Sequence, residues 1–176
     1  MAGSEASGTH NLVLVLGGAR SGKSRHAEAL IAAHPPPWIY IATGEGRDHE
    51  MAVRIAAHRA RRSAEWRTIE APRDLVAALA AAPGQAAVLV DCLTLWLTNL
   101  MLAGADIEAE AARLEHALGA HAGPVVLVAN EVGLGIVPDN ALARRFRDAA
   151  GRLNQRLAAR ADRVVLLVAG LPLTVK

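Results

Sequence analysis

The chain has 176 residues, of which 52% are hydrophobic and 3% aromatic, with a net charge of +2 and a sequence pI of 9.2. This length suits one domain with an aliphatic and alanine-rich core, and the single cysteine, Cys92, excludes an intrachain disulfide framework and a cysteine-based metal site. No apolar run reaches the roughly 18 residues of a membrane span, so stable membrane insertion is not expected. Residues 1–11 lack the regions of a signal peptide. They are expected to be a disordered leader before a single cytoplasmic domain over 12–176.

The first predicted elements are a strand at 12–16 and a helix at 23–33, joined by Gly17-Gly18-Ala19-Arg20-Ser21-Gly22-Lys23-Ser24. This segment matches the phosphate-loop pattern G-x-x-x-x-G-K-[ST] at every fixed position. Its glycines allow successive backbone N–H groups to face an anion, and the helix N-terminus adds a partial positive charge. We expect Lys23 to reach the β- and γ-phosphates of a nucleotide, and the Ser24 hydroxyl to bind Mg²⁺.

A second strand is predicted at 38–42 and a helix at 48–62. On that helix His58 shares a face with two apolar residues and has arginines one turn to either side. A neutral imidazole among arginines suits attack on an α-phosphate, which expels pyrophosphate and leaves a nucleotidyl-histidine. The residues alone favour a simpler interpretation, an arginine-rich amphipathic helix in which His58 has no chemical role.

A weaker strand at 66–70, expected at an edge of the sheet, precedes a helix at 73–82 and a strand at 87–91. Asp91 ends the latter strand, where phosphate-loop enzymes carry a magnesium-binding carboxylate. The alternative is that Asp91 only caps the strand. No glutamate follows Asp91, which disfavours a motor-type ATPase.

The remaining predicted elements are helices at 93–102 and 107–119, a strand at 124–129, a helix at 139–161 and a strand at 163–169. Asn130-Glu131-Val132-Gly133 stands where a switch-type GTPase would carry N-K-x-D, which disfavours that class. The alternation of strands and helices predicts an α/β fold with a doubly wound parallel sheet and helices on both faces.

Taken together, the motifs resemble one family, the bifunctional adenosylcobinamide kinase / adenosylcobinamide-phosphate guanylyltransferases of cobalamin synthesis. The resemblance extends over residues 12–176. The phosphate loop is generic, whereas "EMAVRIAAH" and "NEVGLGIVP…RRFRDAAGRLNQ" are far more specific. The segments that carry the resemblance are "GGARSGKSRHAEAL", "YIAT", "DHEMAVRIAAHRARR", "WRTIEAP", "DCLTLWLTNL" and "NEVGLGIVPDNALARRFRDAAGRLNQRLAARAD".

This resemblance implies a RecA-like P-loop domain with a mostly parallel sheet, in a homo-oligomer for which the family suggests a trimer. It implies phosphorylation of a hydroxyl of adenosylcobinamide with ATP or GTP and Mg²⁺. GMP would then pass from GTP through His58 to the new phosphate, giving adenosyl-GDP-cobinamide and pyrophosphate.

The resemblance also implies the site residues. His58 and Lys23 would be catalytic, and Ser24 and Asp91 would bind the metal. Glu70 would accept hydrogen bonds from guanine or ribose, with a surface ion pair as the alternative. The implied nucleotide-binding set is Gly17, Gly18, Ala19, Arg20, Ser21, Gly22, Lys23, Ser24, Ala42, Thr43, Gly44, Arg59, Ala60, Arg61, Arg62, Glu70 and Asp91.

Three further interpretations of the sequence stay open or are disfavoured. The loop that begins at Asn130 and Glu131 either lies over the corrinoid or serves as loop structure or a subunit contact. A plain P-loop kinase without nucleotidyl transfer is the alternative function. A nucleic-acid-binding module is disfavoured by the low net charge and the few aromatic residues.

Overall fold

A seven-stranded sheet forms the centre of the molecule in the computed structural model, which describes residues 12–45 and 62–176. The strand order is β3-β2-β4-β5-β1-β6-β7, and every neighbouring pair is parallel except β6 and β7. The parallel strands therefore all have their carboxyl ends on the same side of the sheet. We call this side the carboxyl edge, to distinguish it from the edge strands β3 and β7. The strands are β1 Leu12–Gly17, β2 Trp38–Ala42, β3 Trp66–Glu70, β4 Val88–Asp91, β5 Val125–Asn130, β6 Arg163–Val168 and β7 Leu171–Thr174.

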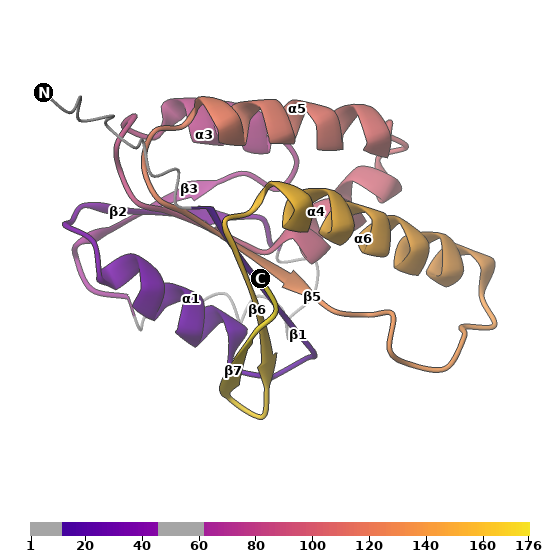
Figure 1. Cartoon of the computed structure of the whole chain (residues 1–176). Helices are drawn as coiled ribbons and strands as arrows, with labels where there is room; N and C mark the ends of the chain where they lie inside the picture. Colours follow the sequence, from indigo (N-terminus) through magenta and orange to yellow (C-terminus); the bar gives the residue numbers. More distant parts are fainter. Residues whose placement is uncertain (1–11, 46–61) are drawn as a thin grey trace, which may run out of the picture.

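Helices cover both faces of this sheet, as predicted. Helix α1 lies on one face, and α3, α4, α5 and α6 lie on the other (Figure 1). Their bounds are α1 Lys23–Ala32, α3 Leu75–Ala81, α4 Leu93–Leu102, α5 Ile107–Ala120 and α6 Ala141–Arg160. The leader at 1–11 and the predicted helix at 48–62, apart from Arg62, lie outside the described residues.

Alternate residues of the inner strands pack into two separate cores. On the face of the four helices, Leu14, Ile41 and Leu127 meet helical side chains such as Leu114 and Leu157. On the α1 face, strand residues from β1, β2, β4, β5 and β6 meet Ala27 and Ile31 of α1. The strands are apolar on both sides because helices cover both sides, which is why they read as continuous hydrophobic runs.

The antiparallel strand β7 is the element that the sequence did not predict. Its hairpin turn is Ala169-Gly170, with φ values of 52° and 82°, the left-handed pair that a tight hairpin turn requires. The predicted strand at 163–169 therefore runs one residue too far. Pro172 lies in β7, where a proline is tolerated because β7 forms the edge of the sheet.

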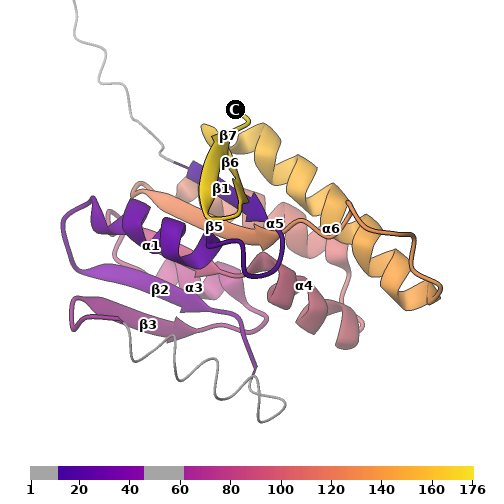
Figure 2. The same cartoon turned by 90° about the horizontal axis from the view of Figure 1, so that it is seen from below.

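The connections after β1 and β5 both lie at the carboxyl edge (Figure 2). In open α/β sheets this edge is where ligands bind. Within residues 12–45 and 62–176, no helix is long and apolar enough to cross a bilayer.

Candidate functional site

The phosphate loop links the end of β1 to the start of α1, and two glycines determine its shape. A Cβ on Gly17 would lie 2.6 Å from the backbone oxygen of Leu167, so no larger residue fits there. Gly22 has a φ of 93° and precedes the first residue of α1, a conformation that L side chains rarely adopt. The sequence pattern at these two positions is thus explained by close approach and by backbone geometry.

Lys23 is held inside this loop. The residue is only 7% exposed, and its Nζ donates a hydrogen bond of 2.5 Å to the backbone oxygen of Gly18. Neighbouring elements hold the loop from outside, because Gly170 N donates to Ser21 O and Glu131 N donates to Gly17 O, at 3.1 and 3.0 Å. An ammonium group in this position can pair with a phosphate that enters the loop.

Asp91 ends β4, next to Ala42 at the end of β2. Its Oδ2 accepts a hydrogen bond of 3.1 Å from the Tyr40 hydroxyl. The donor set of Ser24 and Asp91, a hydroxyl and a carboxylate, suits Mg²⁺, which prefers oxygen and usually keeps waters and substrate phosphates as its other ligands. The part of the chain that the structure describes holds no group of three or more His, Cys, Asp or Glu side chains able to bind a metal.

Thr43 is completely buried and joins the ends of two strands. Its Oγ1 donates to Cys92 O at 2.7 Å and accepts from Cys92 N at 2.8 Å. Asn99 of α4 donates to Thr43 O and to Pro72 O, both at 2.9 Å. Nucleotide binding by Thr43 stays a prediction. The structure adds that the Thr43 hydroxyl is hydrogen-bonded to the backbone N–H and carbonyl groups of Cys92. Asn99 was missed, although an amide within an apolar helix is a recognisable signal.

Arg62 lies over the ring of Tyr40. Its guanidinium carbon is 3.5 Å from the ring centroid, a cation–π contact, and its Nη1 donates to Thr68 Oγ1 at 3.0 Å. Burial, followed by the charge of Asp91, raises the pKa of Tyr40, so its hydroxyl stays protonated. Tyr40 was also missed. The sequence shows only that Tyr40 stands two residues before the end of the predicted strand, and its place on the same sheet face as Asp91 follows from the register of β2 and β4.

The structure thus brings together the predicted residues of several strand ends. Register places Ala42 between Asp91 of β4 and Glu70 of β3. Four predicted residues, His58, Arg59, Ala60 and Arg61, lie outside the described residues.

The loop after β5 begins at the same edge and carries exposed apolar side chains. Asn130 N donates to Thr94 Oγ1 at 2.7 Å, and Gly133 N donates to Glu131 Oε1 at 2.6 Å, so the start of the loop is held in place. Farther along, Leu134 is 86% exposed and Ile136 is 97% exposed. This loop therefore starts beside the phosphate loop and carries exposed apolar side chains farther along.

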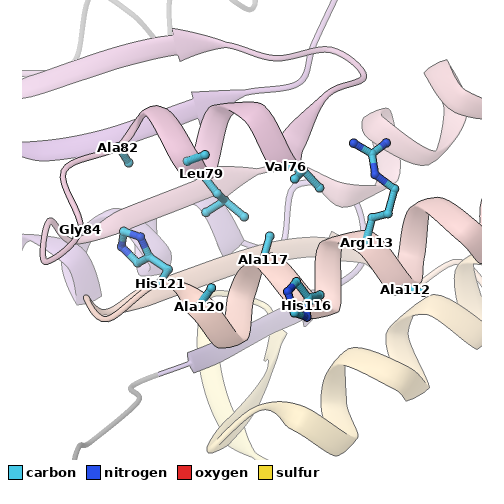
Figure 3. A pocket seen from close by; sticks show the side chains of 11 residues that line it. Val76, Leu79, Ala82, Gly84, Ala112, Arg113, His116, Ala117, Ala120 and His121 are labelled. Atoms are coloured by element: carbon cyan, nitrogen blue, oxygen red, sulfur yellow. The ribbon is translucent and has the colours of Figure 1, made fainter.

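A cavity of about 660 Å³ lies elsewhere, between α3 and α5 (Figure 3). Most of its lining is alanine and other apolar residues, with Arg113, His116 and His121 as the polar side chains. His121 is buried, and its Nε2 lies 3.0 Å from Ala86 O. No residue of the phosphate loop or of the strand carboxyl ends lines this cavity, so it is separate from the candidate site.

Solved structures of low sequence identity share the fold. The flagellar accessory protein FlaH from Methanocaldococcus jannaschii matches with a TM-score of 0.53 and 10% identity, over 95% of this chain and 78% of that one. A prototypical ATPase from the type III secretion system of pathogenic bacteria matches with a TM-score of 0.54 and 11% identity, over 90% of this chain and 51% of that one. At these identities the similarity concerns the fold alone, and the predicted P-loop α/β fold is confirmed.

Sequence comparison identifies much nearer relatives. The bifunctional adenosylcobalamin biosynthesis protein CobP of Pseudomonas aeruginosa is 51% identical over 166 residues, which cover 93% of this chain and 96% of the relative. The bifunctional adenosylcobalamin biosynthesis protein CobU of Salmonella typhimurium is 48% identical over 182 residues, which cover 94% and 99%. Residues 13–175 match the family described as cobinamide kinase / cobinamide phosphate guanyltransferase. The chain therefore belongs to the cobinamide kinase / cobinamide phosphate guanyltransferase family, as its motifs predicted.

Proposed function

We propose that this chain catalyses two consecutive reactions in one domain over residues 12–176. In the first, ATP or GTP phosphorylates a hydroxyl of adenosylcobinamide. In the second, GMP passes from GTP to the new phosphate, and the products are adenosyl-GDP-cobinamide and pyrophosphate. The observation that carries this proposal is the phosphate loop with its buried Lys23, in a chain that matches the family over residues 13–175.

The described residues would perform the first reaction chiefly by positioning and charge. The backbone N–H groups of the loop and the N-terminus of α1 would hold the phosphates, and Lys23 would approach the β- and γ-phosphates. Ser24 and Asp91 would hold Mg²⁺, which when bound neutralises phosphate charge. Because phosphoryl transfer leaves little covalent chemistry to the protein, such positioning accounts for most of the catalysis.

His58 would act in the second reaction as a covalent carrier. An imidazole nitrogen attacks the α-phosphorus of GTP, a P–N bond forms, and the bond to pyrophosphate breaks. A phosphate oxygen of cobinamide phosphate then attacks the same phosphorus and releases the histidine. Glu70, on the strand next to β2, would accept hydrogen bonds from guanine or ribose.

The acceptor would lie against the loop after β5. The exposed Leu134, Ile136 and Val137 suit a large and partly apolar corrinoid. This loop starts at Glu131, whose N–H is bonded to Gly17 of the phosphate loop. A corrinoid on this surface would have its side chain near the γ-phosphate.

Covalent labelling tests the two-step proposal. Incubation with GTP labelled at the α-phosphate is expected to leave one acid-labile GMP per chain, located by peptide mapping at His58. His58→Ala should lose this label. His116→Ala, which changes an exposed histidine of α5, should label like the wild type.

Two outcomes would contradict the proposal. Full labelling of the His58→Ala protein would remove the carrier role of His58. Transfer of the γ-phosphate to the corrinoid without any GMP adduct or pyrophosphate would leave the simpler alternative, a P-loop kinase.

We also propose that the chain forms a cytoplasmic homo-oligomer, a trimer, as the family resemblance implies. The exposed Leu171, Leu173 and Val175 at the β7 edge support association, because such edges often pair or pack against another chain. Sedimentation velocity at micromolar concentration is expected to give a species of about three chains. A monomer over the whole range would contradict the oligomer.

A further inference from the structure

Tyr40 contacts the carboxylate that the proposed function assigns to the metal. Its hydroxyl donates to Asp91 Oδ2 at 3.1 Å, and Tyr40 itself is only 5% exposed. A buried tyrosine hydroxyl needs a hydrogen-bond partner, so packing alone would explain some acceptor in this place. The acceptor found here is a side-chain oxygen of the last residue of β4, at the edge of the sheet where the phosphate loop lies.

The geometry of a carboxylate gives this hydrogen bond a second consequence. An aspartate at the end of a strand can rotate about two side-chain bonds, and each rotation presents different oxygen atoms to a cation. A donor on Oδ2 restricts that rotation and leaves the other oxygen available to a ligand. The phenol has a single proton, and this proton is used for Asp91.

The Tyr40 ring is itself held in one orientation from two sides. Trp66 of β3 meets it edge-on, with ring centroids 6.2 Å apart and planes at 78°. Arg62 covers one ring face at 3.5 Å and is bonded to Thr68 Oγ1 on β3. The hydroxyl therefore has a fixed position relative to β3 and β4, which a donor on a loose side chain would lack.

We infer that Tyr40 is a positioning residue for the metal: it orients the Asp91 carboxylate so that one oxygen faces the cation site beside Ser24. This inference rests on the proposed function, because it takes Asp91 to be a metal ligand. It goes beyond that function by assigning a role to a residue that is neither in the phosphate loop nor part of the predicted nucleotide-binding set.

The direct test is the affinity of the site for Mn²⁺, measured by electron paramagnetic resonance on the full chain with a non-hydrolysable GTP analogue. Tyr40→Phe keeps the ring and removes the hydroxyl. Loss of a hydrogen bond to a ligating carboxylate typically weakens metal binding about 10–100-fold. Because phosphates and Ser24 would share the cation here, we expect a smaller effect, about five- to tenfold.

Trp38→Phe is the matched control. Trp38 lies two residues earlier on β2, on the same sheet face, and its indole N–H donates to His34 O at 2.8 Å. This variant also loses a partly buried hydrogen bond of a β2 side chain but does not touch Asp91. Its Mn²⁺ affinity should stay within twofold of the wild type.

Kinase assays supply the second readout. In Tyr40→Phe the Mg²⁺ concentration for half-maximal rate should rise by the same factor as the Mn²⁺ dissociation constant. At saturating Mg²⁺, kcat and the KM for the corrinoid should stay within twofold of the wild type. A purely structural role would instead lower the unfolding midpoint and leave the metal dependence unchanged, which would overturn the inference.

Asp91→Asn separates this inference from the proposed function. If Asp91→Asn weakens Mn²⁺ binding and Tyr40→Phe does not, only the role of Tyr40 is wrong. If neither variant changes Mn²⁺ binding, Asp91 is not a ligand and both assignments fail. GMP labelling at His58 is measured independently, so the carrier step is judged on its own result.

Discussion

The two faces of the sheet differ in what their residues do. The face under α3, α4, α5 and α6 is almost entirely apolar, and its core includes Trp96, Leu114 and Leu157. The face under α1 also has an apolar core, but near the carboxyl edge it carries Tyr40 and Asp91. The polar groups of the candidate site therefore gather on one face.

This difference predicts that one face of the sheet chiefly provides stability and the other chiefly provides the chemistry. Substitutions under the four helices should cost stability and spare the chemistry, because they remove buried apolar contacts. Substitutions at the carboxyl edge of the α1 face should cost activity and spare stability, because polar groups placed for a ligand contribute little to folding. The following predictions test this separation, from the largest expected effect to the smallest.

Lys23→Ala should give the largest effect. Loss of a positioned cation at the reacting phosphates is expected to lower kcat/KM for phosphoryl transfer about 10²–10³-fold, while the free energy of unfolding changes by less than about 1 kcal/mol because a buried ammonium contributes little net stability. Steady-state kinetics and urea unfolding measure the two quantities.

The other lysine of the chain is the control for Lys23. Lys176 donates to three carbonyl groups at and just beyond the end of α6, those of Ala158, Ala159 and Ala161. Lys176→Ala should lose about 1 kcal/mol of stability and keep its kinetics. Loss of stability without loss of activity in Lys23→Ala, together with loss of activity in Lys176→Ala, would contradict the separation of the faces.

Leu114→Ala tests the apolar face. Leu114 is completely buried on α5, and removal of such a side chain typically costs about 2–5 kcal/mol. Urea unfolding should show this loss, while the folded protein should keep its KM for nucleotide. Leu102→Ala, at an exposed position of α4, should change stability by less than about 0.5 kcal/mol.

Asn99→Ala tests the contact by which helix α4, on the four-helix face, reaches the carboxyl ends of the strands. Asn99 reaches from α4 to the carbonyl groups of Thr43 and Pro72. Its loss leaves one buried and one partly buried acceptor without this donor, at a cost of about 1–3 kcal/mol. Because Thr43 follows β2 at the carboxyl edge, nucleotide affinity should fall by about two- to fivefold as well, by calorimetric titration. Thr98→Ala, which loses only a bond to Thr94 O in its own helix, should not change nucleotide affinity.

The order of elements was predictable because its signals are local. Helices covering both faces make the inner strands continuously apolar, so β1, β2, β4, β5 and β6 were predicted near their observed positions. The edge position of β3 was also correct, since its sequence is more polar. β7 was missed because four residues with a proline resemble a tail, and only pairing with β6 makes them a strand.

Some residues of the candidate site could be predicted from the sequence and others could not. The phosphate loop follows a contiguous pattern, and the structure explains its glycines by close approach and positive φ. Tyr40 and Asn99 were not found, since the partners of their polar atoms are 51 and 56 positions away in the chain. A contact between distant segments leaves no spacing in the sequence that marks it.

The sequence by itself determined the order of the described strands and helices up to β6, the phosphate loop and the family, because hydrophobic periodicity and contiguous motifs are properties of neighbouring residues. Only the tertiary structure decided which strands are neighbours and which side chains meet at their ends. Strand order places Asp91 beside Ala42, and the pleat puts Tyr40 on the Asp91 face. Hydrogen bonds act over about 3 Å, so side chains far apart in the chain interact only after the sheet has brought their strands together.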